Sequence, residues 1–374
     1  MKYFLLTVLF LVFGFSHAQA IETSAKQAYI VDYETGQVLY EKNAQDRMPT
    51  SSMSKVMTAY MVFDALQKDK IKEDESFLVS EKAWQKGGSK MFVPVGERVN
   101  VMDLLRGVII QSGNDATIVL AEALAGTEDA FAKNMTRKAK DIGMKNTNFM
   151  NASGWPDDNH YSTAEDLGIM AKSLIKNFPN YYELYKETEF EFSDIKQSNR
   201  NPLLYENIGA DGIKTGHTEA GGYGLIGSAV RDNRRVVMVL NGMESADERK
   251  EQSLIMMRWA LSNFINKTII QKNQVMGSVP VLYGEMDSVS LVASSDLIRT
   301  ISKSEDEQPQ IKLIHDEIIE APIQKDQKIG TIEVTISPDQ IETIDLLAGT
   351  DIPEAGLVDK TIQKTQQFIK GLLE

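Results

Sequence analysis

The spacing of apolar residues changes several times along the chain, and each change predicts an element of secondary structure. Two short β-like runs at residues 28–32 and 38–41 are separated by the turn sequence ETGQ, a pattern typical of a hairpin. From 55 to 66 the run KVMTAYMVFDAL is apolar on nearly every face, which predicts a helix buried inside a domain. Further helices are predicted at 101–110, 115–125, 127–142, 164–176 and 248–264, and further strands at 212–216, 223–231 and 234–241. This order of strands, helices and strands predicts an α/β (α+β) domain with an antiparallel sheet between helices.

The pattern becomes β-rich after residue 266. Short strand-like segments alternate with Gly, Asp, Asn and Pro turns from 268 to 344, which predicts a small all-β sandwich. The tail at 353–374 differs again, since its apolar residues fall on one stripe at helical spacing: Val358, Ile362, Ile369 and Leu372 or Leu373. Lysines lie elsewhere around this predicted helix. It is expected to lie on a membrane surface, and packing against the β domain is the alternative.

An export signal is predicted at the N-terminus. Lys2 supplies a positive charge, residues 3–15 form a nearly continuous apolar run, and AQA at 18–20 fits a cleavage site. The run is shorter than the roughly 20 residues that a spanning helix needs, so cleavage after Ala20 is favoured over an uncleaved anchor. The predicted segments are a signal peptide at 1–20, an α/β domain at 21–265, a β-sandwich at 266–352 and an amphipathic helix at 353–374.

Composition and charge exclude several classes of protein. The 374 residues exceed what one hydrophobic core usually fills, so two domains are expected. The chain has no cysteine, which excludes disulfides, metal–thiolate sites and a cysteine nucleophile. A formal net charge of −13 makes nucleic acid a poor ligand. Of the four histidines, His17 belongs to the predicted signal and the others lack ligand spacing, so neither a metal nor a cofactor is expected.

The stretch PTSSMSK at 49–55 leads into the buried helix and carries the first candidate chemistry. Ser52 and Lys55 are three residues apart, so both project from one face of the first helical turn. There the lysine amine could take the serine proton, while the helix N-terminus favours negative charge on the oxygen. Alone this S-x-x-K spacing is weak evidence, because serine is also a favoured helix cap. Ser51 lies four residues before the lysine, so spacing by itself leaves it as an alternative.

Two further triplets change this interpretation. Ser112-Gly113-Asn114 follows the apolar run at 108–110 and forms a short turn that can present a hydroxyl and an amide together. Lys214-Thr215-Gly216 lies in a predicted strand, where the glycine allows close approach of the backbone to a ligand. In this order S-x-x-K, S-x-N and K-T-G are the signature set of serine penicillin-binding enzymes.

The chain resembles the low-molecular-mass penicillin-binding proteins of the D-alanyl-D-alanine carboxypeptidase family over essentially its whole length. Beyond the three motifs, the resemblance includes GSKMF (88–92), SGNDA (112–116), NASGWPDDNHYSTAEDL (151–167), SNRN (198–201), KTGHT (214–218), and API (321–323) followed by IGT (329–331). It implies a penicillin-binding/β-lactamase-like transpeptidase domain followed by a small C-terminal all-β domain.

The resemblance also implies a role for each motif residue. Ser52 is the nucleophile that attacks the terminal D-Ala-D-Ala peptide bond, Lys55 is its general base, and Ser112 delivers a proton to the leaving amine. The residues implied in substrate binding are Asn114, Lys214, Thr215, Gly216, His217 and Arg249. The backbone amides of Ser52 and His217 form the implied oxyanion hole.

Several details of these roles remain open at the level of sequence. Arg249 could instead be a solvated helix residue, and Arg200 is a further candidate partner of the substrate carboxylate. His160 is expected to be structural, closing the loop ahead of a helix cap at Ser162. Partial burial and the nearby ammonium of Lys214 are expected to lower the pKa of Lys55, because a general base must be neutral part of the time.

The implied function is a serine-type D-alanyl-D-alanine carboxypeptidase that acts on peptidoglycan pentapeptides and is acylated by β-lactams. A β-lactamase would need a Glu-x-x-Leu-Asn pentapeptide, which the chain lacks. A DD-endopeptidase and a non-catalytic or slow-turnover peptidoglycan-binding protein are the alternatives. The expected location is the periplasmic face of the cytoplasmic membrane, with peripheral binding through the C-terminal helix. The pattern indicates no particular oligomeric state.

Overall fold

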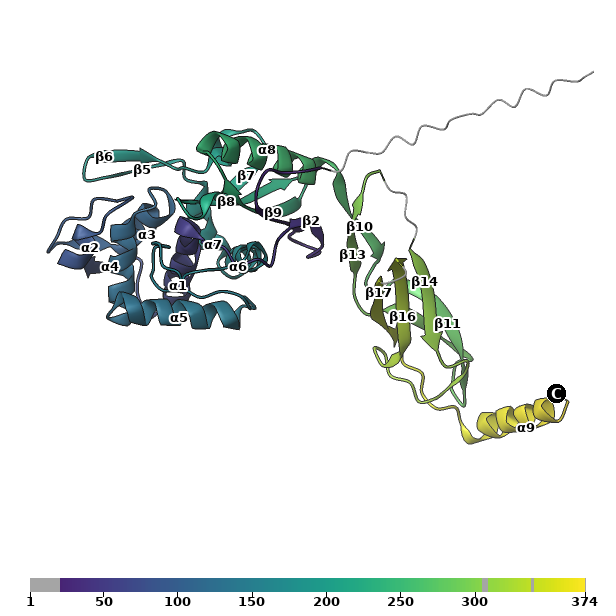
Figure 1. Ribbon diagram of the computed structural model, residues 1–374. Helices are drawn as coiled ribbons and strands as arrows, with labels where there is room; N and C mark the ends of the chain where they lie inside the picture. Colours follow the sequence, from purple (N-terminus) through teal and green to yellow (C-terminus); the bar gives the residue numbers. More distant parts are fainter. Residues whose placement is uncertain (1–20, 305–308, 338–339, 374) are drawn as a thin grey trace, which may run out of the picture.

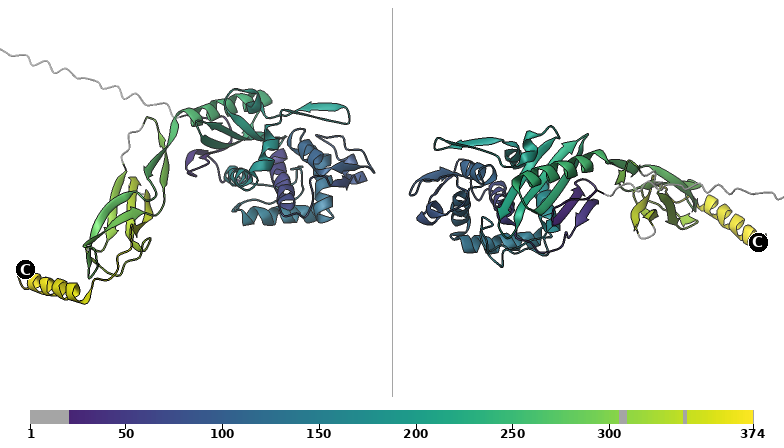
Figure 2. Two further views of the ribbon diagram at one scale, coloured as in Figure 1. Left: turned by 180° about the vertical axis from the view of Figure 1, so that it is seen from behind. Right: turned by 45° about the horizontal axis from the view of Figure 1, so that its top comes forward.

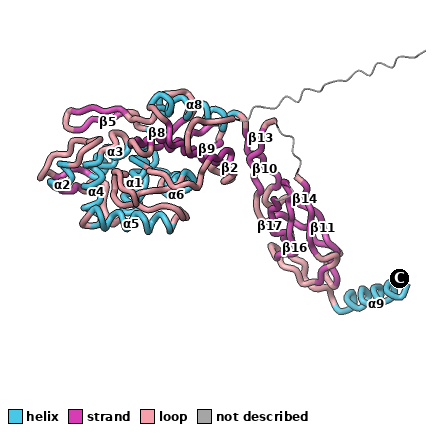
Figure 3. Tube along the Cα trace, viewed as in Figure 1, coloured by secondary structure: helices cyan, strands magenta, loops and turns pink. Residues whose placement is uncertain are grey.

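A computed structural model describes residues 21–304, 309–337 and 340–373. The predicted export signal at 1–20 lies outside the described residues. The described chain forms a mixed α/β part, a separate β-rich part, and a C-terminal helix at the far end of the β-rich part (Figure 1). Coloured by secondary structure, helices and strands alternate in the first part, whereas strands dominate the second (Figure 3).

The α/β part is built on a five-stranded antiparallel sheet in the order β2-β1-β9-β8-β7. Its strands are β1 (Gln27–Asp32), β2 (Val38–Lys42), β7 (Ala210–Thr218), β8 (Gly222–Arg231) and β9 (Arg234–Met243). Strand β7 is an edge strand of this sheet. Its outer backbone groups are therefore available to pair with an extended peptide.

Two hydrophobic layers cover the two faces of this sheet. Along β9, Val237 and Val239 belong to a core with helix α1 (Lys55–Gln67), whereas Met238 and Leu240 pack with helix α8 (Ala246–Ser262). This alternation follows from the two-residue period of a strand. Helix α1 is buried on nearly every side, as its sequence predicts, because other helices surround it. The sheet thus holds α1 and α8 on opposite faces.

The remaining elements of the α/β part lie mainly around α1. The α-helices are α2 (Glu81–Gln85), α3 (Val101–Ile109), α4 (Asn114–Ala125), α5 (Glu128–Asp141), α6 (Ala164–Asn177) and α7 (Pro179–Tyr182); the 3₁₀ helices are η1 (Ser51–Ser54), η2 (Glu183–Lys186) and η3 (Pro202–Tyr205). Two small antiparallel sheets pair β3 (Ser76–Leu78) with β4 (Arg98–Asn100) and β5 (Glu189–Phe192) with β6 (Ile195–Ser198).

The predicted hairpin, helices and strands of this part are confirmed, with small shifts at their ends, but the predicted cap at Ser162 is wrong. Helix α6 is capped by Thr163, whose side chain accepts a hydrogen bond from the backbone N–H of Asp166. The Ser162 hydroxyl instead pairs with that of Thr147 at 2.7 Å. Ser162 and Thr163 are adjacent and both carry a hydroxyl, so the sequence does not show which of them caps the helix. The contact of Ser162 with Thr147 leaves Thr163 as the cap.

The β-rich part contains a two-stranded sheet, β10-β13, and a six-stranded sheet, β14-β16-β17-β12-β11-β15. Its elements are β10 (Phe264–Ile270), β11 (Val275–Leu282), β12 (Ser288–Ala293), β13 (Leu297–Ser302), β14 (Gln310–His315), β15 (Ile319–Glu320), β16 (Lys328–Ser337), β17 (Gln340–Ala348) and the terminal helix α9 (Leu357–Leu373). This part has its own apolar core. It meets the α/β part through polar contacts, such as the 2.6 Å pair of Thr35 and Thr300 hydroxyls, and extends away from it (Figure 2).

No helix in the described part of the chain is long and apolar enough to cross a membrane.

Candidate active site

Ser52 and Lys55 lie where the short helix η1 runs into α1. Ser52 is half-buried, whereas Lys55 is only 1 % exposed. The amine Nζ of Lys55 is 2.9 Å from Ser52 Oγ. Sequence spacing predicted this contact, and the structure places it at the junction of two helix types rather than within one α-helical turn.

The surroundings of the Lys55 amine favour its neutral form. Burial lowers the pKa of Lys55 to about 7, and the positive charges of Arg200 and Lys86 act in the same direction, against the Asp115 carboxylate. Nζ is also 2.7 Å from Asn114 Oδ1 and 2.8 Å from the carbonyl oxygen of Ser153. A neutral amine can donate its two N–H groups to these oxygens and turn its lone pair toward Ser52 Oγ. This is the geometry of a base poised to take the serine proton.

Sequence reasoning expected the charges of Lys55 and Lys214 to repel each other, and they do, since the charge of Lys55 lowers the pKa of Lys214. Arg200 and Lys86, which sequence reasoning did not name for this effect, add positive charge that lowers the pKa of Lys55. The pKa of Lys214 is itself lowered strongly, first by burial and then by the charges of Lys55, Arg200 and Arg249. Burial is therefore the main cause for both lysines.

A second contact joins the other two motifs. Nζ of Lys214 donates to Ser112 Oγ at 3.0 Å and to its neighbouring carbonyl, that of Thr215, at 3.1 Å. Ser112 has a backbone φ of +60°, which few non-glycine residues adopt and which marks a turn held by its surroundings. Asn114 begins α4, and its Nδ2 donates to the carbonyl of Gly87 at 2.8 Å. Its amide therefore bridges Lys55 and the 87–89 loop.

Strand β7 packs directly against η1 at Gly216. A Cβ atom added to Gly216 would lie 3.1 Å from both Ser51 Cβ and the carbonyl oxygen of Thr50, so the glycine permits this close approach. Ser51 Oγ also pairs with Thr218 Oγ1 at 3.0 Å. The packing brings the nucleophile turn beside the strand that carries Lys214, Thr215 and His217.

His160 holds the opposite side of the nucleophile turn. The ring nitrogen Nδ1 accepts the backbone N–H of Met150 at 3.2 Å, so Nε2 carries the proton and donates to Ser54 Oγ at 2.8 Å. The Ser54 hydroxyl is also 2.6 Å from that of Thr50. Burial lowers the pKa of His160 to about 4, which keeps the ring neutral at physiological pH. Ser54 and His160 thus stabilise the turn, and of the three serines it is Ser52 that contacts Lys55 and lines a cavity with Asn114 and His217.

The cleft carries an excess of positive charge. Arg200 donates to Ser89 Oγ at 2.6 Å, and Arg249 lies in the first turn of α8. Neither arginine forms an ion pair within the described residues. The two arginines add positive charge beside the site, which suits an anionic substrate. No cluster of three or more metal-ligating side chains occurs among the described residues.

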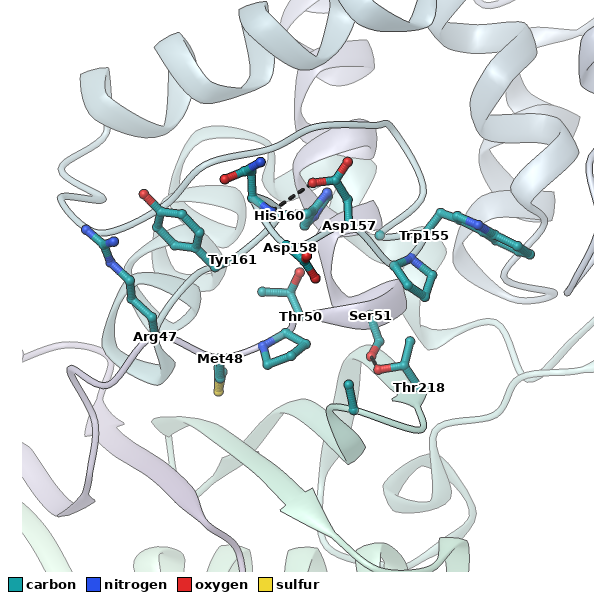
Figure 4. A pocket seen from close by; sticks show the side chains of 15 residues that line it. Arg47, Met48, Thr50, Ser51, Trp155, Asp157, Asp158, His160, Tyr161 and Thr218 are labelled. Carbon is teal, nitrogen blue, oxygen red and sulfur yellow. Dashed lines mark hydrogen bonds between the residues drawn. The ribbon is translucent and has the colours of Figure 1, made fainter.

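Two adjoining cavities lie beside the turn that carries Ser51 and Ser52. The first, of about 510 Å³, contains Ser52, Asn114 and His217. The second, of about 420 Å³, lies beyond Trp155 and is bordered by Arg47, Asp158 and Tyr161 (Figure 4). The two share lining residues on the 154–156 loop and at the end of β7: Gly154, Trp155, Pro156, Thr218 and Ala220. A groove therefore continues from the nucleophile past the end of β7.

The structure brings Ser52, Lys55 and Asn114 into one hydrogen-bonded group, with Lys214 and Ser112 beside it. Sequence reasoning missed the Ser153 carbonyl, because any residue type offers a carbonyl, the wall formed by Trp155, and the packing of Tyr223 on His217. The ring of Tyr223 stacks on that of His217, with centroids 3.9 Å apart. The equal spacing of Tyr223 and His217 from the β7–β8 turn could have indicated this pair.

Comparison with known proteins gives consistent matches over most of the chain. The profile of the D-alanyl-D-alanine carboxypeptidase family matches residues 14–245, and that of the penicillin-binding protein 5 C-terminal domain matches 264–354. The D-alanyl-D-alanine carboxypeptidase DacA of Escherichia coli K12 is 34% identical over 349 residues, which cover 91% of this chain and 87% of the relative.

Solved structures match in the same way. Penicillin-binding protein 5 from Haemophilus influenzae superposes with a TM-score of 0.79 at 34% identity, covering 89% of this chain and 99% of that one. Penicillin-binding protein D2 from Listeria monocytogenes, in its ampicillin-bound form, gives a TM-score of 0.59 at 31% identity and covers 64% of this chain and 97% of its own.

Proposed function

The chain belongs to the D-alanyl-D-alanine carboxypeptidase family, and we propose that it carries out this reaction through an acyl-enzyme on Ser52. It is a serine-type D-Ala-D-Ala carboxypeptidase that removes the terminal D-alanine of peptidoglycan stem peptides. The observation that carries the assignment of residues is the 2.9 Å contact between Ser52 Oγ and a buried lysine whose pKa is lowered to about 7.

The first chemical step is attack of Ser52 Oγ on the carbonyl carbon of the terminal peptide bond. Lys55 takes the hydroxyl proton as the C–O bond forms, and the backbone amides of Ser52 and His217 stabilise the negative charge on the carbonyl oxygen. Collapse of this intermediate breaks the C–N bond. Ser112, linked to Lys214, passes a proton to the leaving nitrogen, so that D-alanine departs as a neutral amine. Water then hydrolyses the ester on Ser52.

The positively charged side chains of the site orient the substrate through its terminal carboxylate. The terminal carboxylate is bound by Lys214, Thr215 and Arg249, and Arg200 adds positive charge to the same side of the site. The peptide chain upstream of the scissile bond pairs with the free edge of β7 near His217. It then leaves through the groove past Trp155 (Figure 4). The same arrangement accepts β-lactams, which acylate Ser52, and one matching structure contains ampicillin.

A turnover assay separates this function from its alternatives. The purified protein is expected to release D-alanine from an N-acylated L-Lys-D-Ala-D-Ala peptide and to leave crosslinked muropeptide dimers intact. Protein acylated beforehand with penicillin serves as the control and should release no D-alanine. Covalent labelling by penicillin without D-alanine release would support a slow-turnover binding protein. Cleavage of the muropeptide dimers would support a DD-endopeptidase.

The proposed organisation assigns residues 1–20 to an export signal, 21–265 to the catalytic domain, 266–352 to the β domain and 353–374 to a membrane-binding helix. The protein is then placed at the periplasmic face of the cytoplasmic membrane. Large apolar side chains at the start of α9 are exposed, with Leu357 at 87 % and Val358 at 73 %. The helix is tied to the β domain by Gln363, whose side chain accepts the backbone N–H of Tyr283 at 2.7 Å. Apolar exposure of this kind suits insertion into a lipid surface.

Deletion of residues 354–374 is expected to release the protein from membranes, because the exposed apolar stripe of α9 is lost with them. Full-length and truncated proteins would be compared by flotation with anionic phospholipid vesicles and by cell fractionation. Penicillin labelling of the truncated protein should persist and serves as the control for folding. Equal membrane association of the two proteins would contradict the anchor and favour a helix that packs on the β domain.

A further inference from the structure

We propose that Tyr223 determines selectivity for a free terminal carboxylate by holding the guanidinium of Arg249 at the β7 edge of the cleft. The inference rests on the proposed function, because it concerns the group that distinguishes a carboxypeptidase substrate from an internal peptide bond. Tyr223 is a positioning residue in this proposal, and Arg249 is the group that meets the carboxylate.

The Tyr223 ring stands between a strand residue and a helix residue. On β8 it pairs directly with His217 of β7, and the two rings are stacked with centroids 3.9 Å apart and planes 29° apart. The Arg249 guanidinium carbon lies 5.5 Å from the Tyr223 ring centroid, within range of a cation–π contact. One half-buried ring therefore connects the start of α8 with the end of β7.

The Tyr223 ring lies on the face of the sheet that α8 covers. Tyr223 packs against the apolar layer between the sheet and α8. Its partner His217 and the nearby Thr215 share that face, because alternate residues of a strand point the same way. Lys214 points to the opposite face, where it reaches Ser112. A guanidinium held on Tyr223 can thus approach the carboxylate from the side opposite to Lys214.

Arg249 has few other interactions to hold it in place. Its position in the first turn of α8 sets a cation near the positive end of the helix dipole, which is unfavourable. Its guanidinium forms no hydrogen bond or ion pair within the described residues, and Nε is buried without a partner. The acidic neighbour Glu248 is engaged elsewhere, with the Ser24 hydroxyl and the backbone N–H of Glu244. The Tyr223 ring is therefore the group that orients Arg249.

The arrangement resembles a site prepared for an anion rather than a structural ion pair. A structural arginine would be expected to have an acidic partner, since an unpaired partly buried cation is costly. The charge of Arg249 also acts on Lys214, where it contributes to lowering the pKa of that lysine. A substrate carboxylate between the two cations would relieve this repulsion, and a terminal amide would not.

The test compares two substrates that differ in charge alone, an N-acylated peptide ending in D-Ala-D-Ala and the same peptide ending in D-Ala-D-alaninamide. The readout is the ratio of kcat/KM for the acid to that for the amide. Tyr223→Leu is expected to lower this ratio about tenfold, as for loss of a desolvated cation–π contact. The ratio does not depend on the fraction of active protein, because that fraction scales both rates equally.

Two variants serve as controls for the aromatic ring. Tyr223→Phe keeps the ring face and is expected to retain most of the selectivity ratio. Tyr40→Leu makes the same substitution in the same apolar layer, where Tyr40 packs on Trp259 near the other end of α8. It is expected to lower thermal stability without changing the ratio. If Tyr223→Leu does not fold, Tyr223→Met supplies an unbranched apolar side chain for the same measurement.

A double-mutant cycle decides whether Tyr223 acts through Arg249. Arg249→Gln should lower the acid rate, and Tyr223→Leu should add little in that background. Equal losses for acid and amide, or additive losses in the double variant, would overturn the proposal and leave Tyr223 a packing residue. The cycle can be measured with the acid substrate alone, so it shows whether Tyr223 acts through Arg249 even if turnover of the amide substrate is too slow to measure. Absence of D-alanine release by the unmodified protein would instead contradict the proposed function itself.

Discussion

Ser52→Ala is expected to abolish covalent labelling by penicillin and to lower D-alanine release by at least about 10⁴-fold. The variant removes the only atom that forms the acyl bond, while the neighbouring amine and the oxyanion donors remain. The substitution should change stability little, because Ser52 is half-buried and, among the residues that the structure describes, its hydroxyl is hydrogen-bonded to Lys55 alone. Labelling would be followed with a fluorescent penicillin, and turnover with the acylated tripeptide substrate.

Two neighbouring serines provide matched controls for this substitution. Ser51→Ala removes a hydroxyl that pairs with Thr218, and Ser54→Ala removes one that pairs with Thr50 and His160. Both should lower the melting temperature, because they weaken the contacts that hold the turn, yet both should remain labelled. Covalent labelling of Ser52→Ala, or loss of labelling in Ser51→Ala with the fold intact, would refute Ser52 as the nucleophile.

Lys55→Arg is expected to slow acylation of Ser52 by at least about 10³-fold, since a guanidinium cannot give up its proton near neutral pH. The pH dependence provides the sharper test. The pKa of Lys55 is lowered to about 7, so the neutral fraction rises as the pH increases through 7. In the unmodified protein the second-order rate constant of acylation should therefore rise through this range and level off above it.

The pH profile separates loss of a base from damage to the fold. The acylation rate constant of Lys55→Arg should not rise near pH 7. Lys55→Met, which removes the charge and the base together, should be acylated as slowly. Lys86→Arg is the matched control, because it preserves the positive charge that acts on Lys55 and should keep the midpoint near 7. If the acylation rate constant of Lys55→Met still rises near pH 7, the titrating group is not Lys55.

The lowered pKa of Lys55 connects the fold to the chemistry. The chain places this lysine at the start of a helix surrounded by apolar residues, and burial then disfavours its charged form. Sequence reasoning anticipated the direction of the shift and the repulsion between Lys55 and Lys214. It did not anticipate the charges of Arg200 and Lys86, which approach from loops far away in sequence. Positions of side chains on distant loops follow from packing and cannot be obtained from motif spacing.

The motif residues themselves could be found from the sequence because their spacing is local. Ser52 and Lys55 sit three apart on one helical face, and Lys214 to His217 occupy a strand with a two-residue period. The elements that hold them depend on long-range contacts. The cap of α6 is Thr163 rather than Ser162, because the Ser162 hydroxyl finds a partner in Thr147 on another segment.

The sequence alone determined the family resemblance, the order of helices and strands, and the residues proposed to carry the acyl-transfer chemistry. Periodicity and motif spacing are properties of neighbours along the chain, so they are readable without coordinates. Only the tertiary structure decided which partners Ser51 and Ser54 bind, which distant charges act on the pKa of Lys55, and that Tyr223 joins His217 to Arg249. Each of these depends on burial and on contacts between segments far apart in sequence, which arise only when the sheet and its two helical layers come together.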